Sequence, residues 1–534
     1  METILAYVRA IVAERDPGRA NDMAAAALGH GLRHSAFHSA RARWLQLNDR
    51  NSEALGELQL AIALAPHDAE ILQSIGISLL RLGRPANAIA AFDAAIRIAP
   101  ADAQAHYLKG CACSAAGEPT AALRSHERAI ALRPDHADAL AAAAAAAARA
   151  GDSAKARRFA ERTLRVVPAH PTAIIALAMC DIHDSEFVQA EKHLGALLSA
   201  FPARDETRAL ALGLLGDAFD GQDRTDTAFE AYTEENEILR DLYKLRFDGE
   251  ARLAGRVEQL IVGLQEEVAS PPEPAISDSS PAKRHVFLLG FMRSGTTLLE
   301  QVLAAHSDVE TLEERETLAG LCPGYMGRSD GSPNLYLPHG KELDLARETY
   351  WRRVRAFGAK PDDKIFVEKQ PFNTLFLPLI ARLFPSAKII FQVRDPRDVI
   401  LSCFRRHLEV KPTTFELLTL ADAARFYDRV MRCGELCRSK LPLDIFEVRY
   451  EDIVSEFDNS VLAICRHLGM EWTDSMRDFD RSARSRAIRS VSSSQVRQRL
   501  YPDGIGYWHR YEKQLAPVLP SLRPWVERFG YPAD

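Results

Sequence analysis

A repeat of 34 residues runs through the first part of this chain and restricts its fold more than any other feature. The interval is kept by prolines, glycines and alanines: Pro66, Pro100, Pro134, Pro168 and Pro202; Gly83, Gly117 and Gly151; Ala88, Ala122 and Ala156. A small alanine lets two helices pack closely, a glycine ends the first helix of a unit, and a proline starts the turn after the second. The period therefore predicts a solenoid of helix pairs.

The residues of one unit support this prediction. From Asp102 to Pro134 the chain reads DAQAHYLKGCACSAAGEPTAALRSHERAIALRP, with apolar residues at helical spacing in both halves. This pattern resembles the tetratricopeptide repeat (TPR), whose length is 34 residues, over roughly residues 35 to 240. The resemblance implies an all-α solenoid whose concave face holds a protein or peptide partner. A platform for stabilisation or for a homodimer is the alternative that the sequence leaves open.

The composition changes after the repeats. Residues 268–282 read VASPPEPAISDSSPA, which is rich in proline and serine and has no apolar period. Such a segment is typical of an extended linker. We therefore predict a TPR domain at residues 1–245, a linker at 246–283 and a second domain at 284–534. A chain of 534 residues is also too long for one ordinary core.

The second domain opens with a motif that suits an anion. In HVFLLGFMRSGTTLLEQVL, which begins at His285, an apolar strand runs into a tight loop from Gly290 to Thr297, and helical spacing follows. This order of elements points backbone N–H groups and a helix N-terminus at one place, where a phosphate binds well. The spacing of the two glycines is that of a P-loop, but Thr296 stands where a nucleotide-hydrolysing enzyme carries its lysine. The loop is therefore predicted to bind a phosphate-like group without nucleoside triphosphate and magnesium.

A second segment predicts a second phosphate site. The apolar strand AKIIFQV at 387–393 runs into RDPRDVILSCFRR, which supplies Arg394, Ser402 and Arg406. Arginine offers a planar fork of donors and serine adds one more, which suits a dianionic group. Ser402 and Arg406 are four residues apart and share one helical face, whereas Arg405 lies off it.

The two segments, in this order, resemble the sulfotransferase family over roughly residues 284 to 534. The resemblance implies that the first loop holds the 5′-phosphosulfate of 3′-phosphoadenosine 5′-phosphosulfate (PAPS), that the second segment holds its 3′-phosphate, and that no metal takes part. The residues implied for the first site are Arg293, Ser294, Gly295, Thr296 and Thr297, and those for the second are Arg394, Ser402 and Arg406.

The pattern of elements agrees with such a fold. Apolar strands at 286–290, 364–368, 387–393 and 444–448 alternate with helical stretches, which predicts a parallel sheet covered by helices. The fold class expected for the whole chain is thus an all-α TPR solenoid followed by an α/β P-loop-like domain. Ligands of such sheets bind at the carboxyl ends of the strands, and Arg293, Lys369 and Arg394 all follow predicted strands.

Transfer of a sulfuryl group to a hydroxyl needs a base, cations at the leaving oxygen and fixed phosphates. Tyrosylprotein sulfotransferases use a glutamate at a fixed distance after the loop, and Glu314 lies at that distance from Arg293. The resemblance also implies that Lys369 meets the leaving phosphate and that Tyr450 lies near the adenine. Asn373 is a candidate for orienting the site. The alternative for Glu314 is a solvated helix face shared with neighbouring acids, with His306 as the next candidate base.

The last block of interest runs from residue 486 to 511. By resemblance, Ser492 supports the transition state, and Gln495, Arg497 and Tyr501 lie in a segment that covers PAPS. Tyr507 departs from the pattern, because tyrosylprotein sulfotransferases carry a lysine before the tryptophan matched by Trp508. One expected cation is therefore missing at this end of the site.

These observations predict a PAPS-dependent sulfotransferase that releases adenosine 3′,5′-bisphosphate, with a protein or peptide tyrosine as the favoured acceptor. A small molecule or a saccharide is the alternative acceptor. A P-loop nucleotide kinase or NTPase is opposed by Thr296 in the lysine position. A TPR scaffold whose nucleotide-binding domain has lost catalysis is opposed by the joint presence of Arg293, Glu314 and Lys369.

Composition narrows the setting. A net charge of −6 argues against a general nucleic-acid binder. No apolar run reaches the length of about 18 residues needed to span a membrane, and the N-terminus lacks a signal-peptide core. Eight cysteines in so long a chain make no disulfide framework. We therefore expect a cytoplasmic protein that binds neither membranes nor nucleic acid.

Overall fold

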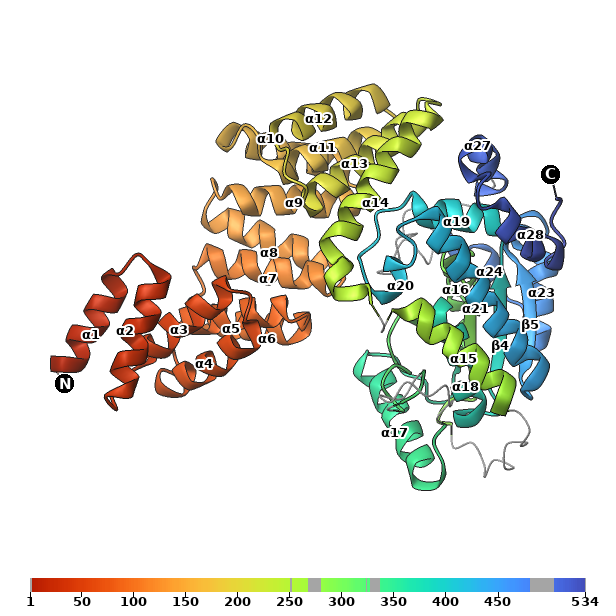
Figure 1. The fold of residues 1–534 in the computed structure, drawn as a ribbon, viewed down its shortest axis with the longest axis horizontal. Helices are drawn as coiled ribbons and strands as arrows, with labels where there is room; N and C mark the ends of the chain where they lie inside the picture. Colours follow the sequence, from red (N-terminus) through yellow and green to blue (C-terminus); the bar gives the residue numbers. More distant parts are fainter. Residues whose placement is uncertain are drawn as a thin grey trace. The chain divides into compact units, whose positions relative to one another are not determined.

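A computed structural model of the chain describes residues 2–249, 252–267, 280–322, 324–326, 337–480 and 504–533. The chain divides into two compact units, Met1–Leu197 and Leu198–Asp534. The colours of Figure 1 follow the sequence through both units, and each unit is described separately below.

The first unit consists of antiparallel helix pairs. Its helices are α1 (Glu2–Ala13), α2 (Pro17–Gly29), α3 (Ser35–Leu47), α4 (Asn51–Leu64), α5 (Ala69–Arg81), α6 (Pro85–Ile98), α7 (Ala103–Ala115), α8 (Pro119–Leu132), α9 (Ala137–Arg149), α10 (Ser153–Val166), α11 (Pro171–His183) and α12 (Phe187–Ala200), the last of which extends beyond Leu197.

The periodic residues play the parts that the repeat predicts. Gly83, Gly117 and Gly151 follow the first helices of successive pairs at φ values of 69°, 72° and 80°, where glycine is favoured. The periodic alanines, of which Ala88 is one, are fully buried in the second helices. The predicted helical-repeat fold is thereby confirmed for this part of the chain.

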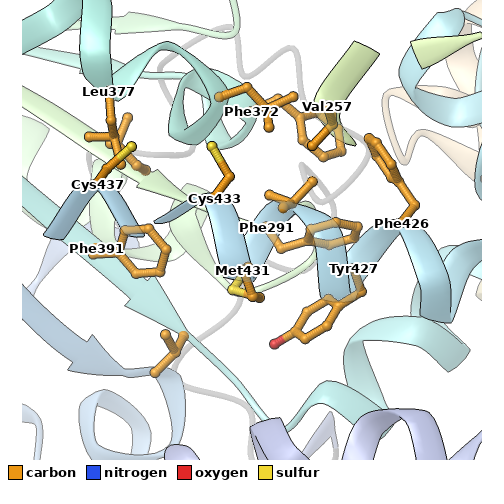
Figure 2. Close-up of a cluster of buried hydrophobic side chains, with 14 of the residues drawn as sticks. Val257, Phe291, Phe372, Leu377, Phe391, Phe426, Tyr427, Met431, Cys433 and Cys437 are labelled. Atoms are coloured by element: carbon orange, nitrogen blue, oxygen red, sulfur yellow. The ribbon is translucent and has the colours of Figure 1, made fainter. Parts of the chain in front are cut away.

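The second unit begins with three helices, α13 (Glu206–Asp220), α14 (Thr225–Phe247) and α15 (Leu253–Glu267). This division differs from the sequence-based one, which placed residues 206–245 in the repeat domain and 246–283 in a linker. Helix α15 carries Val257, Leu260, Ile261 and Leu264 at helical spacing, and all four are buried. Figure 2 shows Val257 among the aromatic side chains of the core. The proline- and serine-rich signal of the linker lies at 268–279, outside the described residues.

A five-stranded parallel sheet forms the centre of the second unit. Its strands are β1 (Arg284–Gly290), β2 (Val309–Glu313), β3 (Ile365–Lys369), β4 (Lys388–Val393) and β5 (Asp444–Arg449), in the order β2-β3-β1-β4-β5. The four strands predicted from sequence are confirmed, and β2 is additional. It lies at the edge of the sheet with only Val309 and Leu312 buried, so its apolar signal is weak. The strand order reverses direction between β1 and β4, which is where ligands of such sheets bind.

Further helices of the second unit lie around the sheet. They are α16 (Thr296–Ala304), α17 (Gly340–Ala356), η1 (Pro371–Phe376), α18 (Leu377–Leu383), α19 (Pro396–Phe404), α20 (Pro412–Phe415), α21 (Leu420–Lys440), α22 (Tyr450–Ser455), α23 (Phe457–Leu468), α24 (Asp474–Arg477), η3 (Tyr507–Tyr511), α27 (Glu512–Leu515) and α28 (Leu519–Arg528).

The side chains of β1 alternate between two cores. Phe287 and Leu289 join the cluster with α15 and α21, part of which Figure 2 shows, whereas Val286 and Leu288 join a cluster with α16 and α23. Burial on both faces explains why these strands read as continuous apolar runs. The arrangement leaves the strand ends as the place where polar side chains gather. Among the described residues no helix is both long and apolar enough to cross a membrane.

Candidate functional site

The carboxyl ends of four adjacent strands meet at one edge of the sheet. The glycine loop follows β1, Glu314 follows β2, Lys369 ends β3 and Arg394 follows β4. Because all five strands are parallel, these residues lie on the same side of the sheet, around the point where the strand order reverses. The fold thus gathers residues that the sequence separates widely.

The loop after β1 has an unusual backbone. Gly290 has a φ of 153°, and a Cβ atom there would lie 2.3 Å from the carbonyl oxygen of Gln392. Gly295 has a φ of 92°, and its Cβ would lie 2.3 Å from the Tyr450 ring. Arg293 adopts a φ of 68° although it is not a glycine, which is a strained conformation often found at functional sites. The loop therefore brings its backbone very close to its neighbours.

Helix α16 begins at Thr296, directly after this loop. The first N–H groups of a helix have no partner within it and carry partial positive charge. Ser294, Thr296 and Thr297 are buried around this helix start. The loop and the first turn of α16 thus offer buried hydroxyl groups and backbone N–H donors where the sequence predicts an anionic group.

Positively charged side chains converge beside the loop. The Nε of Arg293 donates to Ser402 Oγ at 3.0 Å, and Nη1 of Arg394 donates to the carbonyl oxygen of Arg293 at 3.2 Å. Burial, together with the positive charges of Arg406 and Arg394, lowers the pKa of Arg293 to about 10. Arg293, Arg394 and Arg406 therefore lie close enough for their charges to repel one another, a repulsion that a bound dianion would relieve.

The two consecutive arginines at the end of α19 behave differently. Arg406 is partly exposed, and its Nη1 lies 3.4 Å from Oδ2 of Asp217. Arg405 is mostly buried and pairs with Asp220, and its Nη2 also lies 4.0 Å from Oδ1 of Asp217. The Arg406 side chain is thus available to a ligand, whereas Arg405 is committed to helix α13.

Tyr450 links the loop to the arginines. Its ring contacts the Cα side of Gly295, and the guanidinium of Arg394 lies over it at 4.9 Å from the ring centroid. Burial raises the pKa of Tyr450, so the ring stays neutral beside Arg394. Tyr450 therefore packs between the two predicted phosphate sites.

Lys369 is the fully buried cation of the site. Its Nζ lies 2.7 Å from Oε1 of Glu314, 3.3 Å from Oε1 of Glu313 and 3.7 Å from Oε2 of Glu300. It also donates to Thr297 Oγ1 at 3.4 Å, which connects it to the start of α16. Burial lowers the pKa of Lys369, but the carboxylates of Glu314, Glu300 and Glu313 outweigh it and hold the pKa above its usual value. The lysine therefore remains an ammonium.

Glu314 occupies a strained position just past β2. Its φ is 42°, and its backbone N–H donates to the carbonyl oxygen of Lys369 at 2.8 Å. The side chain is 38% exposed, so it can reach both Lys369 and solvent. Because Glu314 follows a strand, it does not lie on the solvated helix face that the sequence offered as its alternative.

The other candidate base lies elsewhere. His306 precedes β2, at the amino edge of the sheet, and its Nδ1 accepts from the backbone N–H of Asp308 at 3.1 Å. Glu314 follows the same strand at the carboxyl edge. His306 is therefore on the side of the sheet away from Lys369.

Sequence reasoning missed two buried carboxyl groups. Burial raises the pKa of Glu300, on α16, to about 7, and Lys369 opposes this rise. Burial likewise raises the pKa of Glu368 to about 7, although Thr317, Tyr350 and Asn373 all donate hydrogen bonds to it. The signal that could have revealed Glu300 is an acid at a buried position of α16, directly after two leucines.

Asn373 contacts Glu368. Its Nδ2 donates to Glu368 Oε1 at 2.7 Å, and Glu368 directly precedes Lys369 on β3. The predicted orienting role of Asn373 would therefore operate on the strand end. Four other predicted residues, Ser492, Gln495, Arg497 and Tyr501, lie outside the described residues.

Family comparisons match two parts of the chain. Residues 285–474 match the sulfotransferase family, and residues 69–102 match the tetratricopeptide repeat. The first range contains Arg293, Glu314, Lys369 and Arg394, and the second lies within the helix pairs of the first unit.

Three relatives are 27% to 28% identical to this chain over the matched parts. An uncharacterized protein of Aquifex aeolicus is 27% identical over 64% of this chain and 44% of its own length. Protein-tyrosine sulfotransferase 1 of Danio rerio is 27% identical over 46% of this chain and 72% of that protein. Protein-tyrosine sulfotransferase 2 of Gallus gallus is 28% identical over 46% of this chain and 69% of that protein. The chain thus spans less than half of the Aquifex aeolicus relative.

Solved structures resemble this chain only weakly. The MamA protein covers 40% of the chain with a TM-score of 0.26 at 18% identity, and 96% of MamA is matched. The type IV pilus biogenesis factor PilW covers 40% of the chain with a TM-score of 0.34 at 17% identity, and 95% of PilW is matched. Similarities of this size carry no functional argument.

Proposed function

We propose that this chain, which joins tetratricopeptide repeats to a sulfotransferase-family domain, transfers a sulfuryl group from PAPS to an acceptor hydroxyl. The observation that carries the proposal is the pairing of Lys369 with Glu314 at the strand ends, beside the anion-binding loop. Transfer of a sulfuryl group to a hydroxyl requires a base for the hydroxyl proton and a positive charge near the leaving oxygen. The Glu314 carboxylate and the Lys369 ammonium would supply these two groups side by side.

The residues support a simple sequence of events. The Glu314 carboxylate accepts the proton of the acceptor hydroxyl, whose oxygen attacks the sulfur atom. A new bond forms between that oxygen and sulfur while the bond from sulfur to the bridging phosphate oxygen breaks. The Lys369 ammonium would neutralise the charge that remains on this oxygen, and the products are a sulfate ester and adenosine 3′,5′-bisphosphate.

The donor side of the site favours a nucleotide with two phosphate groups. The loop and the start of α16 supply backbone donors for the 5′ group, and Arg394, Ser402 and Arg406 would hold the 3′-phosphate. The lowered pKa of Arg293 reflects burial first and then the positive charges of Arg406 and Arg394, and these neighbouring charges support binding of a dianion. A kinase or NTPase remains the less favoured alternative, since Thr296 occupies the position of the P-loop lysine.

A protein or peptide tyrosine is the proposed acceptor. The Danio rerio and Gallus gallus relatives are protein-tyrosine sulfotransferases. The resemblance to that class implies that Glu314 occupies the position of the base. The repeat region supports a peptide acceptor, because helix-pair solenoids present extended surfaces to peptides. A small molecule or a saccharide is the alternative acceptor.

All eight cysteines are free thiols, which supports a reducing, cytoplasmic setting.

Nucleotide binding tests the proposal first. Calorimetry should compare adenosine 3′,5′-bisphosphate with ADP, and with ATP in the presence of magnesium. We expect tight binding that requires the 3′-phosphate and no metal. A preference for ATP with magnesium would contradict the proposal and favour the kinase.

A second experiment addresses the acceptor. Sulfate transfer from labelled PAPS should be measured to tyrosine peptides, to simple phenols and to saccharides. A protein acceptor is supported if the KM for the tyrosine peptides is lower than the KM for the phenols and the saccharides. Transfer only to a saccharide or a simple phenol would retain the reaction and replace the acceptor.

A further inference from the structure

The helix pair α13–α14 packs against the helix that carries Ser402. Phe404, at the end of α19, stacks on Phe229 of α14 with ring centroids 5.2 Å apart. The carbonyl oxygen of Phe404 accepts from Nδ2 of Asn236 at 2.9 Å, and Asn236 is buried. The end of α19 is therefore held by side chains of α14.

Asp220, the last residue of α13, accepts hydrogen bonds from two further segments of the chain. It is 6% exposed and accepts hydrogen bonds from Arg405, Tyr507, Arg510 and Tyr511. Arg405 follows α19 directly, and the other three residues belong to η3. One buried carboxylate thus joins α13 to both segments.

The segment before η3 reaches the donor side of the site. Nη2 of Arg394 donates to the carbonyl oxygen of Gly504, and the backbone N–H groups of Gly506 and Trp508 each donate to Asp398 at 2.8 Å. Tyr507, which replaces an expected lysine, turns its hydroxyl to Asp220. The position that lacks the cation therefore attaches this segment to α13.

Asp217 lies one turn before Asp220 on α13 and faces Arg406. Its Oδ2 lies 3.4 Å from Arg406 Nη1, while its Oδ1 accepts from the Tyr232 hydroxyl at 2.9 Å. Tyr232 is fully buried, so Asp217 is itself held in place. A guanidinium carries five N–H donors, so this contact leaves donors for a phosphate.

We propose that Asp217 is a positioning residue for the 3′-phosphate of the donor, because it holds the Arg406 guanidinium within electrostatic reach of Arg293 before the nucleotide binds. The inference rests on the proposed function, since it assigns a 3′-phosphate to Arg406. An Arg406 side chain without this contact would sample many rotamers. Because Asp217 fixes the side chain in advance, less conformational entropy is lost when the nucleotide binds. The expected gain in affinity is about 2- to 10-fold.

The test compares nucleotides that differ only in the 3′-phosphate. Calorimetry on the full chain should measure Kd for adenosine 3′,5′-bisphosphate and for adenosine 5′-phosphate, in the unchanged protein and in Asp217→Asn. The asparagine keeps an acceptor for Tyr232, so the fold should be retained. We expect about 2- to 10-fold weaker binding of the bisphosphate, an unchanged Kd for the monophosphate and an unchanged kcat at saturating PAPS.

Two further variants sharpen the comparison. Asp226→Asn is the matched control, because Asp226 lies on α14 and contacts Lys513 and Gln514 at the surface. Its Kd values should equal those of the unchanged protein. In an Arg406→Gln background, Asp217→Asn should have no further effect, because its action passes through Arg406.

The outcomes separate the inference from the proposed function. If the unchanged protein binds both nucleotides equally, the proposed function fails and the inference fails with it. If the unchanged protein prefers the bisphosphate and Asp217→Asn leaves that preference intact or increases it, the inference alone is overturned. If Asp217→Asn weakens the binding of both nucleotides equally, the inference is also overturned, because a purely structural role would affect both Kd values.

Discussion

At the scale of single residues, Glu314 combines a strained backbone with a partner of opposite charge. Its left-handed φ directs the side chain back to Lys369, at 2.7 Å, from the end of a neighbouring strand. Strain of this kind persists only where the surrounding structure imposes it. Here the left-handed φ of Glu314 is held by the hydrogen bond from its backbone N–H to the carbonyl oxygen of Lys369.

Replacing Glu314 by glutamine should abolish transfer and leave nucleotide binding nearly unchanged. A missing base lowers kcat by about 10²- to 10⁴-fold, whereas the phosphate contacts remain. Steady-state kinetics with PAPS, together with calorimetry, measure both quantities. Glu310→Gln is the control, because Glu310 lies on the same strand and accepts from the backbone of Lys360. Full activity of Glu314→Gln would contradict the assignment of Glu314 as the base.

Arg394→Ala should show the converse pattern. It removes a predicted contact to the 3′-phosphate and raises the KM for PAPS, with a smaller effect on kcat at saturation. The same kinetic assay measures it. An unchanged KM would contradict the assignment of Arg394 to the donor.

The raised pKa of Glu368 predicts that the free energy of unfolding depends on pH. Its pKa is raised by burial from 4.5 to about 7, so the folded protein binds more protons than the unfolded chain between these values. The free energy of unfolding should therefore fall as pH rises from about 4.5 to about 7. At about 1.4 kcal/mol for each pH unit, the contribution of Glu368 is at most about 3.5 kcal/mol.

Urea unfolding across this pH range measures the effect. Glu368→Gln cannot ionise, so its unfolding free energy should fall less steeply between pH 4.5 and 7 than that of the unchanged protein. Equal slopes in the two proteins would show that Glu368 does not titrate in this range.

At the scale of elements, α15 illustrates how a local signal can mislead. The proline- and serine-rich segment after it suggested a linker from residue 246, yet α15 covers the core with one apolar face. Its apolar residues are spaced for a helix, and their burial is decided by contact with α21, which lies far along the chain.

Truncating that face should destabilise the second unit. Leu260→Ala is expected to lower the free energy of unfolding by about 2 to 5 kcal/mol, because Leu260 is 2% exposed. Arg256→Ala, on the exposed face of the same helix, should change it by less than about 0.5 kcal/mol. Denaturant unfolding compares the two variants, and equal effects would contradict the packing of α15.

At the scale of the whole molecule, the second unit begins earlier than the repeat pattern indicates. Apolar side chains of α13 and α14 form clusters with Phe404, Phe415 and Leu418, and Asp220 pairs with buried Arg405. Removing these helices would expose the apolar surface and leave a buried charge without its partner, which destabilises proteins by about 3 to 5 kcal/mol.

Two truncations distinguish the boundaries. A fragment of residues 198–534 should unfold cooperatively and bind adenosine 3′,5′-bisphosphate. A fragment of residues 246–534, which follows the sequence-based boundary, should aggregate or lack a cooperative transition. Thermal unfolding and calorimetry test both fragments. Identical behaviour would show that α13 and α14 are dispensable.

The candidate site was predictable in part, for identifiable reasons. The glycine loop, Lys369 and Arg394 each follow an apolar strand, and this relation is visible in the sequence. Strand β2 was missed because an edge strand with two buried residues has little apolar pattern. Glu300 was missed because its importance depends on Lys369, which approaches it from another strand.

The sequence by itself determined the helix-pair repeats, the strand–loop–helix motif and the positions of polar residues at strand ends, because each arises from local periodicity. Only the tertiary structure decided which carboxylates surround Lys369, that α15 packs on the core, and that Asp217 and Asp220 of α13 meet Arg406 and Arg405. Such contacts join residues far apart in the chain. They depend on which faces pack together and on which buried charge neutralises which, and no local pattern encodes either.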